Sequence, residues 1–248
     1  MKTRVVLIGI GGATCSGKTT LAKHLRRILP NSVIIHQDHV FLQPQELVPV
    51  HPMYGVQDWD RAEGAIEWPR MIKALEEVRR TGVIPPEHVS HDHLNEQKDV
   101  PIDETTFQKW RKRFEEVEQE HRERGEKVKW VIVDGFLLFW EPQVVEKLDH
   151  RIFLRVPHDV LKQRRHERHG YHTAEGSLWR DPPNYWEQIV WPAYVAAHEQ
   201  ILENGDVEHG KPNGKVPGLL LFEGLEVGMS EMVERVCSVL DTGAVGGD

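Results

Sequence analysis

The sequence predicts an α/β fold, a parallel five-stranded sheet flanked by helices and completed by a lid segment. Five short apolar runs alternate with segments of helical periodicity, and a glycine-rich turn joins the first run to the first helix. Runs this continuously apolar do not suit a half-exposed strand, so we expect both faces of the sheet to be covered. Strands that alternate with helices in this way form parallel sheets.

The five expected strands are rich in Val, Ile and Leu. They are residues 4–10, 32–35, 130–133, 151–156 and 218–222. The first run is the most continuously apolar, and we therefore expect it at the centre of the sheet.

Four segments place apolar residues at the spacing of one helix face. The first follows the glycine-rich turn, carries Leu21, Leu25 and Ile28, and ends before Pro30, because a residue that precedes proline disfavours the helical conformation. The other three cover residues 68–78, 107–117 and 232–240.

At 248 residues the chain has the length of one large domain or two small ones, and the continuous strand–helix alternation favours one. We expect a single domain over residues 1–241 and a flexible tail over 242–248. Three segments stand out from the regular pattern: a polar inserted segment over about 81–129, a lid over about 162–184, and an exposed loop over 203–217. The apolar stripe of the inserted helix is expected to pack against the main domain.

Composition excludes several classes of protein. The chain has 31 Lys and Arg against 39 Asp and Glu, a net charge of -8, and no dense basic block, so no nucleic-acid partner is expected. No apolar run approaches the ~18 residues that span a bilayer, so no membrane partner is expected either. Two cysteines, Cys15 and Cys237, exclude a disulfide framework and favour the cytoplasm. We expect a monomer or a small homo-oligomer.

A phosphate-binding loop is the most specific motif in the chain. Residues 12–19 match GxxxxGK[ST] at every fixed position, between a buried strand and an amphipathic helix. The backbone N–H groups of such a loop curve around a polyphosphate, Lys18 can reach its β- and γ-phosphates, and Thr19 offers a hydroxyl to Mg²⁺. A dinucleotide-binding GxGxxG pattern fails, because Thr14 stands at its third glycine. The candidate nucleotide-binding residues are Gly12, Ala13, Thr14, Cys15, Ser16, Gly17, Lys18, Thr19 and Thr20.

Two aspartates follow predicted strands. Asp38 comes just after the second strand, and Asp134 ends the third. The carboxyl ends of parallel strands meet at one edge of the sheet, so both side chains should face Lys18. Asp38 can accept the proton of an attacking hydroxyl, or orient it, and can hold magnesium-bound water. Asp134 is expected to anchor Mg²⁺ together with Thr19. A turn or helix-capping role is the alternative for each carboxylate.

A basic cluster lies within this acidic chain. Arg164, Arg165 and Arg168 have helical spacings, so two of them can share one face. Guanidinium groups suit the charge that develops on a transferred phosphoryl group. A segment with glycines and prolines follows, as expected of a lid. The alternative is a solvated helix face.

With these residues in place, the chain resembles the nicotinamide riboside kinases, in the uridine-kinase-like branch of the phosphate-loop kinases, and its fungal-type members. The resemblance runs from about residue 4 to about residue 202 and implies the P-loop NTPase fold. Its matching stretches are the phosphate loop, Gln37-Asp38, Gln57-Asp-Trp59-Asp60, Asp134-Gly-Phe-Leu-Leu-Phe139, Arg164-Arg165 with Arg168, and Trp191-Pro192-x-Tyr194.

The resemblance implies ATP-dependent phosphorylation of a ribose 5′-hydroxyl, with Mg²⁺, to give nicotinamide mononucleotide for NAD biosynthesis. It makes Asp38 the catalytic base, with Lys18, Asp134 and Arg165 also in the catalytic set and Asp38 and Asp134 beside both metal and substrate. Arg164 and Arg168 would contact ATP from the lid.

The resemblance also implies a riboside pocket. Asp60 and Arg165 would hold the ribose hydroxyls, while Trp59 and Tyr171 would sandwich the nicotinamide ring. The residues themselves favour such a substrate, because aromatic faces attract a permanently charged pyridinium and Asp58, Asp60 and Glu63 surround Trp59 with negative charge.

The chain departs from the family pattern at three positions and in one segment. The family often carries Glu at the position of Asp134, so the shorter side chain shifts the reach of the carboxylate. His39 stands where a second acidic residue often follows Asp38. Tyr171 needs a one-residue gap to align, and the segment 81–129 is longer than its usual equivalent.

Several alternatives stay open from the sequence. A uridine or cytidine kinase, or another small-nucleoside kinase, would use the same loop and acids. A nucleotide-binding regulatory protein without catalysis would keep the loop alone. The residues do not decide between ATP and GTP, or between nicotinamide riboside, nicotinic acid riboside and pyrimidine nucleosides.

Overall fold

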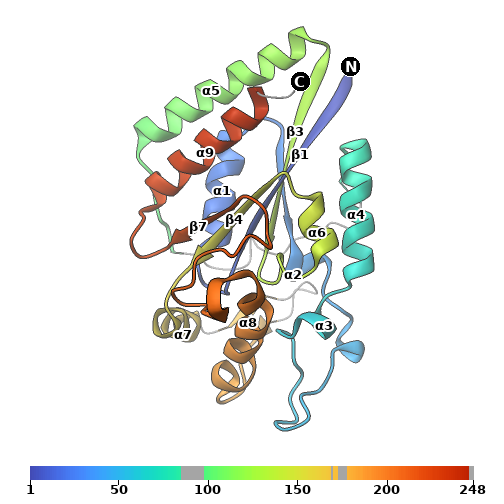
Figure 1. Ribbon diagram of the computed structural model, residues 1–248, viewed down its shortest axis with the longest axis vertical. Helices are drawn as coiled ribbons and strands as arrows, with labels where there is room; N and C mark the ends of the chain where they lie inside the picture. Colours follow the sequence, from blue (N-terminus) through green and yellow to red (C-terminus); the bar gives the residue numbers. More distant parts are fainter. Residues whose placement is uncertain (85–97, 169, 173–177, 246–248) are drawn as a thin grey trace.

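The computed structural model describes residues 1–84, 98–168, 170–172 and 178–245. Its centre is a five-stranded sheet with the strand order β2-β3-β1-β4-β7, in which every pairing is parallel (Figure 1). The predicted fold class and the central place of the first strand are confirmed. The strands are β1 (Lys2–Gly12), β2 (Ser32–His36), β3 (Glu126–Gly135), β4 (His150–Arg155) and β7 (Leu219–Glu223).

The two longest strands begin earlier than their apolar runs predict. Lys2 pairs with Glu126, and Thr3 pairs with Lys127, so β1 and β3 extend together beyond the rest of the sheet. Hydropathy does not reveal these polar ends, because what holds them is the backbone hydrogen bonding of one strand to the other.

Helices cover both faces of the sheet, and the side chains of β1 alternate between two cores. Val6, Ile8 and Ile10 pack in one core, and Val5 and Leu7 pack in the other. The first core lies under α1 (Lys18–Ile28), α5 (Glu104–Glu123) and α9 (Met229–Val245). The second lies under α4 (Trp68–Thr81), α6 (Pro142–Lys147) and α8 (Trp191–His198).

The described part of the inserted segment is a structural cover of the sheet. On α5, Phe114 is fully buried with its ring 5.4 Å from that of Trp130 on β3. The indole nitrogen of Trp110 donates to Glu234 on α9 at 2.6 Å, and Lys109 pairs with the same carboxylate. The packing expected for this helix is confirmed.

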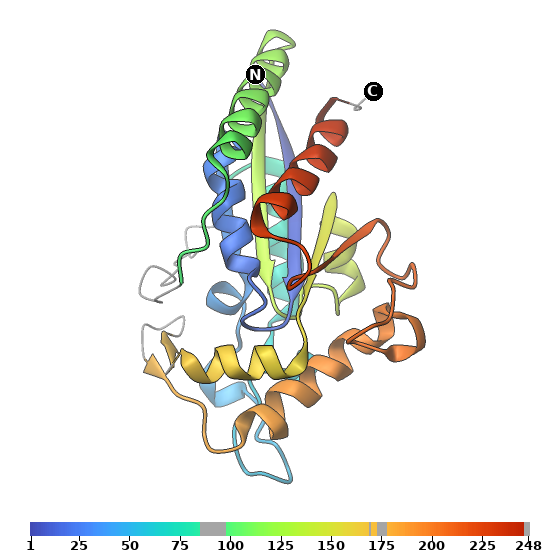
Figure 2. The same cartoon turned by 90° about the vertical axis from the view of Figure 1, so that its left-hand side faces the viewer.

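The predicted lid begins inside α7 (His158–Glu167), which lies across the carboxyl ends of the strands (Figure 2). It continues through a short antiparallel pair, β5 (Tyr171–His172) and β6 (Leu178–Trp179), and reaches a π-helical turn over Trp186–Val190 that leads into α8. Short elements also fill the connection between β2 and α4: α2 (Gln37–Val40), a 3₁₀ turn over Gln45–Leu47 and α3 (Ala62–Ala65).

Two peripheral expectations differ from the structure. The loop 203–217 is not simply exposed, since Val207 and Val216 are buried and the Gly210 carbonyl accepts a hydrogen bond of 2.6 Å from buried Arg155. Two isolated valines among charged residues give no periodic signal. The predicted tail begins inside α9, which continues to Val245. None of the described helices has the length and apolar character of a membrane span.

Candidate functional site

A cleft of about 1520 Å³ opens at the carboxyl ends of the strands. Most of the residues singled out from the sequence line it, although they come from five separate stretches of chain. These are Thr14, Cys15, Ser16, Gly17, Lys18, Thr19, Thr20, Asp38, Trp59, Asp60, Asp134, Arg164, Arg165 and Arg168. Gly12 and Ala13 shape the loop without being part of the lining. The Tyr171 side chain lies outside the described part of the structure.

The phosphate loop needs glycine for steric reasons. Gly12 has φ 133°, and a Cβ there would lie 2.2 Å from the Leu154 carbonyl oxygen. Gly17, with φ 100°, precedes the first turn of α1, where no side chain caps the helix. The buried hydroxyl of Ser16 has no hydrogen-bond partner among the described residues. These free donors at a helix N-terminus suit phosphate oxygens.

The backbone of the loop holds the Lys18 side chain in place. Its buried ammonium group donates to the Ala13 carbonyl at 2.7 Å. Burial lowers the pKa of Lys18, while the nearby carboxylates of Asp134 and Asp38 act in the opposite direction. The sheet edge thus gathers one cation and two anions in a small volume, as the strand-end argument expects.

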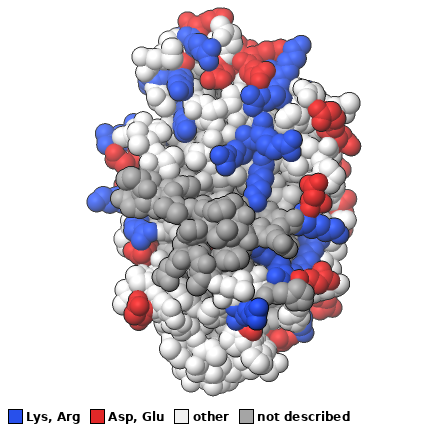
Figure 3. Space-filling view, turned by 180° about the vertical axis from the view of Figure 1, so that it is seen from behind, with Lys and Arg blue, Asp and Glu red and all other residues white. Residues whose placement is uncertain are grey.

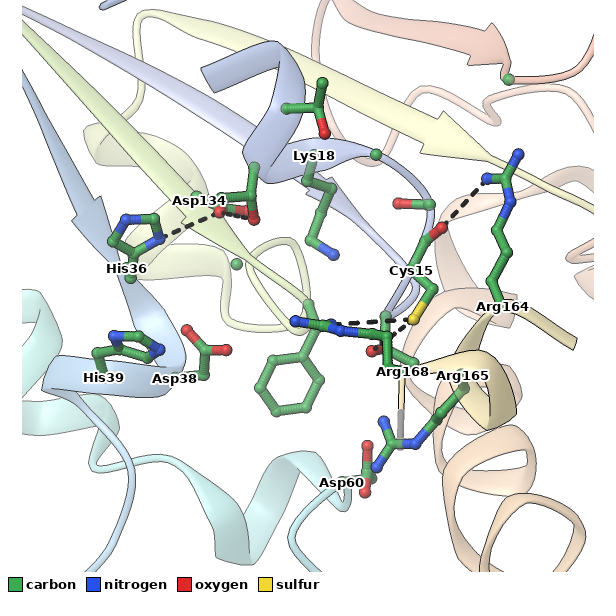
Figure 4. A pocket seen from close by; sticks show the side chains of 18 of the residues that line it. Cys15, Lys18, His36, Asp38, His39, Asp60, Asp134, Arg164, Arg165 and Arg168 are labelled. Carbon is green, nitrogen blue, oxygen red and sulfur yellow. Dashed lines mark hydrogen bonds and ion pairs between the residues drawn. The ribbon is translucent and has the colours of Figure 1, made fainter. Parts of the chain in front are cut away.

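Asp134 lies beside Thr19 at the end of β3. The Thr19 hydroxyl donates to its Oδ2 at 2.6 Å, and His36 Nδ1 lies 3.2 Å from the same oxygen (Figure 4). Burial raises the pKa of Asp134, but His36 and Lys18 more than offset it, so the pKa lies below its usual range. His36 was not predicted, and its register opposite Asp134 in the β2–β3 pair is what brings it there.

The donors at this point fit a magnesium ion. Mg²⁺ takes few protein oxygens and completes its shell with phosphate oxygens and water. Thr19 and Asp134 supply a hydroxyl and a carboxylate in contact with each other. Across the described residues there is no cluster of three or more His, Cys, Asp or Glu side chains of the kind that holds a metal without a ligand's help.

Asp38 stands in α2, directly after β2, and reaches the cleft opposite Lys18. Its position is set by its neighbour Gln37, which is fully buried and accepts the Leu137 N–H at 3.0 Å. Gly135 allows this contact, because a Cβ there would lie 2.6 Å from Gln37 Oε1. Gln37 thereby fixes the turn that carries Asp38 to the end of β3.

The arginines of α7 divide between the two halves of the cleft. Arg164 donates to the Cys15 carbonyl at 3.2 Å, and Arg168 donates to Cys15 Sγ at 3.9 Å, so this pair faces the phosphate loop (Figure 4). Arg165 points the other way and makes two hydrogen bonds to Asp181, of 2.6 and 2.9 Å. The expectation that two of the three share a face is confirmed for Arg164 and Arg168.

Aromatic side chains gather in the half of the cleft away from the loop. The rings of Trp59 and Trp179 lie 6.2 Å apart and nearly perpendicular, at 69°. The backbone N–H of Trp59 donates to the Tyr185 hydroxyl at 3.3 Å. In β5 the backbone of Tyr171 pairs with that of Trp179. The sequence analysis did not predict Trp179, Asp181 or Tyr185. The sequence offered one hint of them, since Trp179 stands two positions before Asp181 in the expected lid.

Acidic groups surround these rings. Asp60 is buried, and burial raises its pKa to about 6 against the opposing charge of Arg165. Buried Asp58 accepts the N–H groups of Asp60 and Arg61 at 3.3 and 2.9 Å, which fixes the turn around Trp59. The cleft therefore has one half at the glycine-rich loop, whose donors suit phosphate, and an acidic, aromatic half, with Asp38 between them.

Comparison with known proteins gives consistent results. The nicotinamide riboside kinase of Saccharomyces cerevisiae is 33% identical over 206 residues, which cover 83% of this chain and 82% of that protein. That of Schizosaccharomyces pombe is 33% identical over 84% of this chain and 85% of its own length. Human nicotinamide riboside kinase 2 is 28% identical over 81% of this chain and 70% of its own.

Two further comparisons add little. No family model matches the chain. An unliganded sugar kinase from Janibacter sp. HTCC2649 covers 99% of both chains, but its TM-score of 0.41 and identity of 14% are too low to bear on function. From the sequence relatives and a phosphate loop set between β1 and α1 of a parallel sheet, it follows that the chain belongs to the nicotinamide riboside kinase family and is more similar to the fungal members above than to the human one.

Proposed function

We propose that the protein transfers the γ-phosphate of ATP to the ribose 5′-hydroxyl of nicotinamide riboside and so makes nicotinamide mononucleotide. The observation that carries this proposal is the joining of two different sites in one cleft. A loop built for polyphosphate meets an acidic, aromatic pocket, and Asp38 lies between them. Family membership supports the same reaction.

The phosphate half would hold and orient the nucleotide. The loop N–H groups and the Ser16 hydroxyl donate to phosphate oxygens, and Lys18 moves from the Ala13 carbonyl to the β- and γ-phosphates. Arg164 and Arg168 already lie against the loop, where they can neutralise charge on the transferred group. The described geometry does not distinguish adenine from guanine.

Thr19 and Asp134, with Asp38 nearby, would hold Mg²⁺. The ion, when bound, neutralises charge on the phosphate oxygens. His36 and Thr19 both contact Asp134 Oδ2, which leaves the second carboxylate oxygen for other partners. This arrangement keeps Asp134 ionised, as the lowered pKa indicates.

Asp38 would accept the proton of the 5′-hydroxyl or orient that hydroxyl for in-line attack. Proton transfer by a positioned side chain contributes about 10²–10⁴-fold to a rate. Lys18 stands opposite Asp38, so a hydroxyl bound between them faces the γ-phosphate.

The riboside half would recognise both charge and sugar. A flat pyridinium cation gains roughly 0.5–2 kcal/mol from each aromatic face, depending on desolvation. Trp59 supplies one face, and Asp58 and Asp60 supply negative charge. Tyr171 stays the predicted second face. Asp60 and Arg165 would bind the ribose hydroxyls, because a carboxylate accepts and a guanidinium donates.

The remaining expectations concern the surroundings of the enzyme. A monomer or small homo-oligomer in the cytoplasm, without nucleic-acid or membrane partners, stays a prediction.

The test is an assay of ADP and product formation with purified protein across nicotinamide riboside, nicotinic acid riboside, uridine and cytidine, with ATP and GTP in parallel. We expect the highest kcat/KM on a pyridine riboside. A higher kcat/KM on uridine would identify a pyrimidine nucleoside kinase, and ATP binding without any product would indicate a regulatory protein.

A further inference from the structure

We propose that Asp181 is a positioning residue that holds Arg165 and Trp179 in the orientation in which the pocket binds a vicinal diol. The proposal rests on the proposed function, because Arg165 is taken there to bind the ribose hydroxyls. Asp181 does not line the cleft, whereas Arg165 and Trp179 do, so it acts through them.

One carboxylate makes three hydrogen bonds to these two side chains. Arg165 Nε donates to Asp181 Oδ2 at 2.6 Å, and its Nη2 donates to Oδ1 at 2.9 Å. The indole nitrogen of Trp179 donates to the same Oδ1 at 2.9 Å. Two parallel bonds fix the plane of a guanidinium, and such charge-assisted pairs are the strongest hydrogen bonds that side chains make.

The pair is well shielded, which strengthens the restraint. The Arg165 side chain is 7% exposed and that of Asp181 is 21% exposed. Burial would raise the pKa of Asp181, but the hydrogen bonds from Arg165 and Trp179 hold it below the usual range. Asp181 therefore stays ionised at neutral pH and accepts hydrogen bonds from both Arg165 and Trp179.

Arg165 lies between two carboxylates that compete for it. Its guanidinium is turned toward Asp60, whose pKa responds to the charge of Arg165 (Figure 4). On its other side, Arg165 forms an ion pair with Asp181, in which Nε lies 2.6 Å from Oδ2. Without Asp181, the guanidinium would turn to the buried and poorly solvated Asp60.

This competition matters for binding of the sugar. A diol needs an acceptor and a donor that are both available, and a direct Asp60–Arg165 pair would use each to satisfy the other. Asp181 binds Nε and Nη2 and so restrains Arg165 from turning further toward Asp60, while both Asp60 and Arg165 line the cleft.

The same carboxylate links the sugar half to the ring half of the pocket. Trp179 stands nearly perpendicular to Trp59, and the two rings form a corner that lines the cleft. The hydrogen bond from the indole nitrogen to Asp181 fixes the ring plane of Trp179 relative to Arg165. Asp181 thereby sets the distance between the ring-binding corner and the diol-binding arginine.

The experiment compares nicotinamide riboside with its 2′-deoxy analogue in the wild type and in Asp181→Asn. We expect the KM for the riboside to rise about tenfold or more in the variant, because charged hydrogen bonds that orient the diol are lost. The KM for ATP should stay within about twofold, because Arg164 and Arg168 contact the loop independently of Asp181. The preference for the riboside over the deoxy analogue, as a ratio of kcat/KM values, should fall about fivefold or more.

Matched variants separate positioning from general stability. Asp241→Asn makes the same change in the Arg113–Asp241 pair between α5 and α9, whose residues do not line the cleft, and should leave the ratio unchanged. Asp181→Glu keeps the carboxylate and should restore most of the preference. Trp179→Phe keeps a ring and removes one donor, so it should lower the preference by less than Asp181→Asn.

Three results would contradict the positioning role of Asp181 or the proposed function. An unchanged ratio in a folded Asp181→Asn protein, or an equal rise in both KM values, contradicts the proposal. Should that variant fail to fold by circular dichroism, Trp179→Phe takes its place, and an unchanged ratio there contradicts it equally. A wild type that phosphorylates no riboside overturns the proposed function instead, before any variant is compared.

Discussion

In the proposed reaction each carboxylate of the cleft has its own role, and Asp38 is the proposed proton acceptor. Asp38→Ala should lower kcat by about 10²-fold or more, because the attacking hydroxyl loses its proton acceptor, while the melting temperature stays near that of the wild type. Asp159→Ala removes an aspartate from the first turn of another helix, α7, where its side chain is 96% exposed. That control should retain full activity, and near-normal turnover of Asp38→Ala would remove Asp38 from the mechanism.

We expect recognition of a pyridinium ring to depend on Trp59. Trp59→Ala should raise the KM for nicotinamide riboside by roughly 2–30-fold, the equivalent of one desolvated cation–π contact, with little change in the KM for ATP. Trp59→Phe should restore part of the affinity. Equal increases in both KM values would discredit a stacking role.

Asp60 makes binding and stability depend on pH in opposite ways. Its pKa in the folded protein, about 6, lies above the ordinary 3.8, so folding favours the protonated form. Ionising Asp60 lowers the free energy of unfolding. This loss is absent below pH 4, grows between pH 4 and pH 6, and reaches at most about 3 kcal/mol above that range, for a shift of about two pKa units. Asp60→Asn should therefore be more stable than the wild type at pH 7 and lose that advantage at pH 4, as measured by urea unfolding.

Binding should follow the ionised form of the same residue. The KM for the riboside should fall as pH rises from 5 to 7, and Asp60→Asn should flatten this profile while raising KM at neutral pH. A wild-type profile that stays unchanged in Asp60→Asn would show that another group titrates.

At the scale of elements, apolar pattern and turn chemistry predicted the sheet and the loop, because both are local in sequence. The apolar run alone predicts that Val6 and Ile8 are buried. The loop motif alone predicts a glycine conformation at Gly12. The starts of β1 and β3 could not be predicted, since residues such as Lys2 are strand only because Glu126 pairs with them.

The lid shows the same limit at the site. Asp181 is 16 positions from Arg165, and no period or motif joins them. The carboxylate reaches the guanidinium only in the folded lid, where β6 pairs with β5. Asp134 was predicted because strand ends converge, whereas His36 was missed because register across two strands is invisible in one sequence.

The inserted helix α5 is expected to act through stability rather than catalysis. Phe114→Ala should cost about 3–5 kcal/mol, because it empties a fully buried site between α5 and Trp130. Below the unfolding temperature kcat and both KM values should stay close to those of the wild type. A selective change in KM for one substrate would instead assign α5 a part in binding.

On the scale of the whole molecule, the net charge does not show how positive and negative side chains are distributed. The chain carries -8, yet Lys and Arg side chains gather near the middle of its rear face (Figure 3). The cleft repeats this separation of charge, with Lys18 and two arginines at the phosphate loop and Asp58 and Asp60 around Trp59. The cleft can thus bind an anion and a cation side by side. This suits a reaction between a triphosphate and a positively charged riboside.

The most direct test of this arrangement is a crystal structure with a non-hydrolysable ATP analogue and nicotinamide riboside bound together. We expect the triphosphate along residues 12–20, the pyridinium ring against Trp59, and the 5′-hydroxyl within hydrogen-bond distance of Asp38. A riboside bound elsewhere, or one whose 5′-hydroxyl points away from Asp38 and the γ-phosphate, would contradict the account.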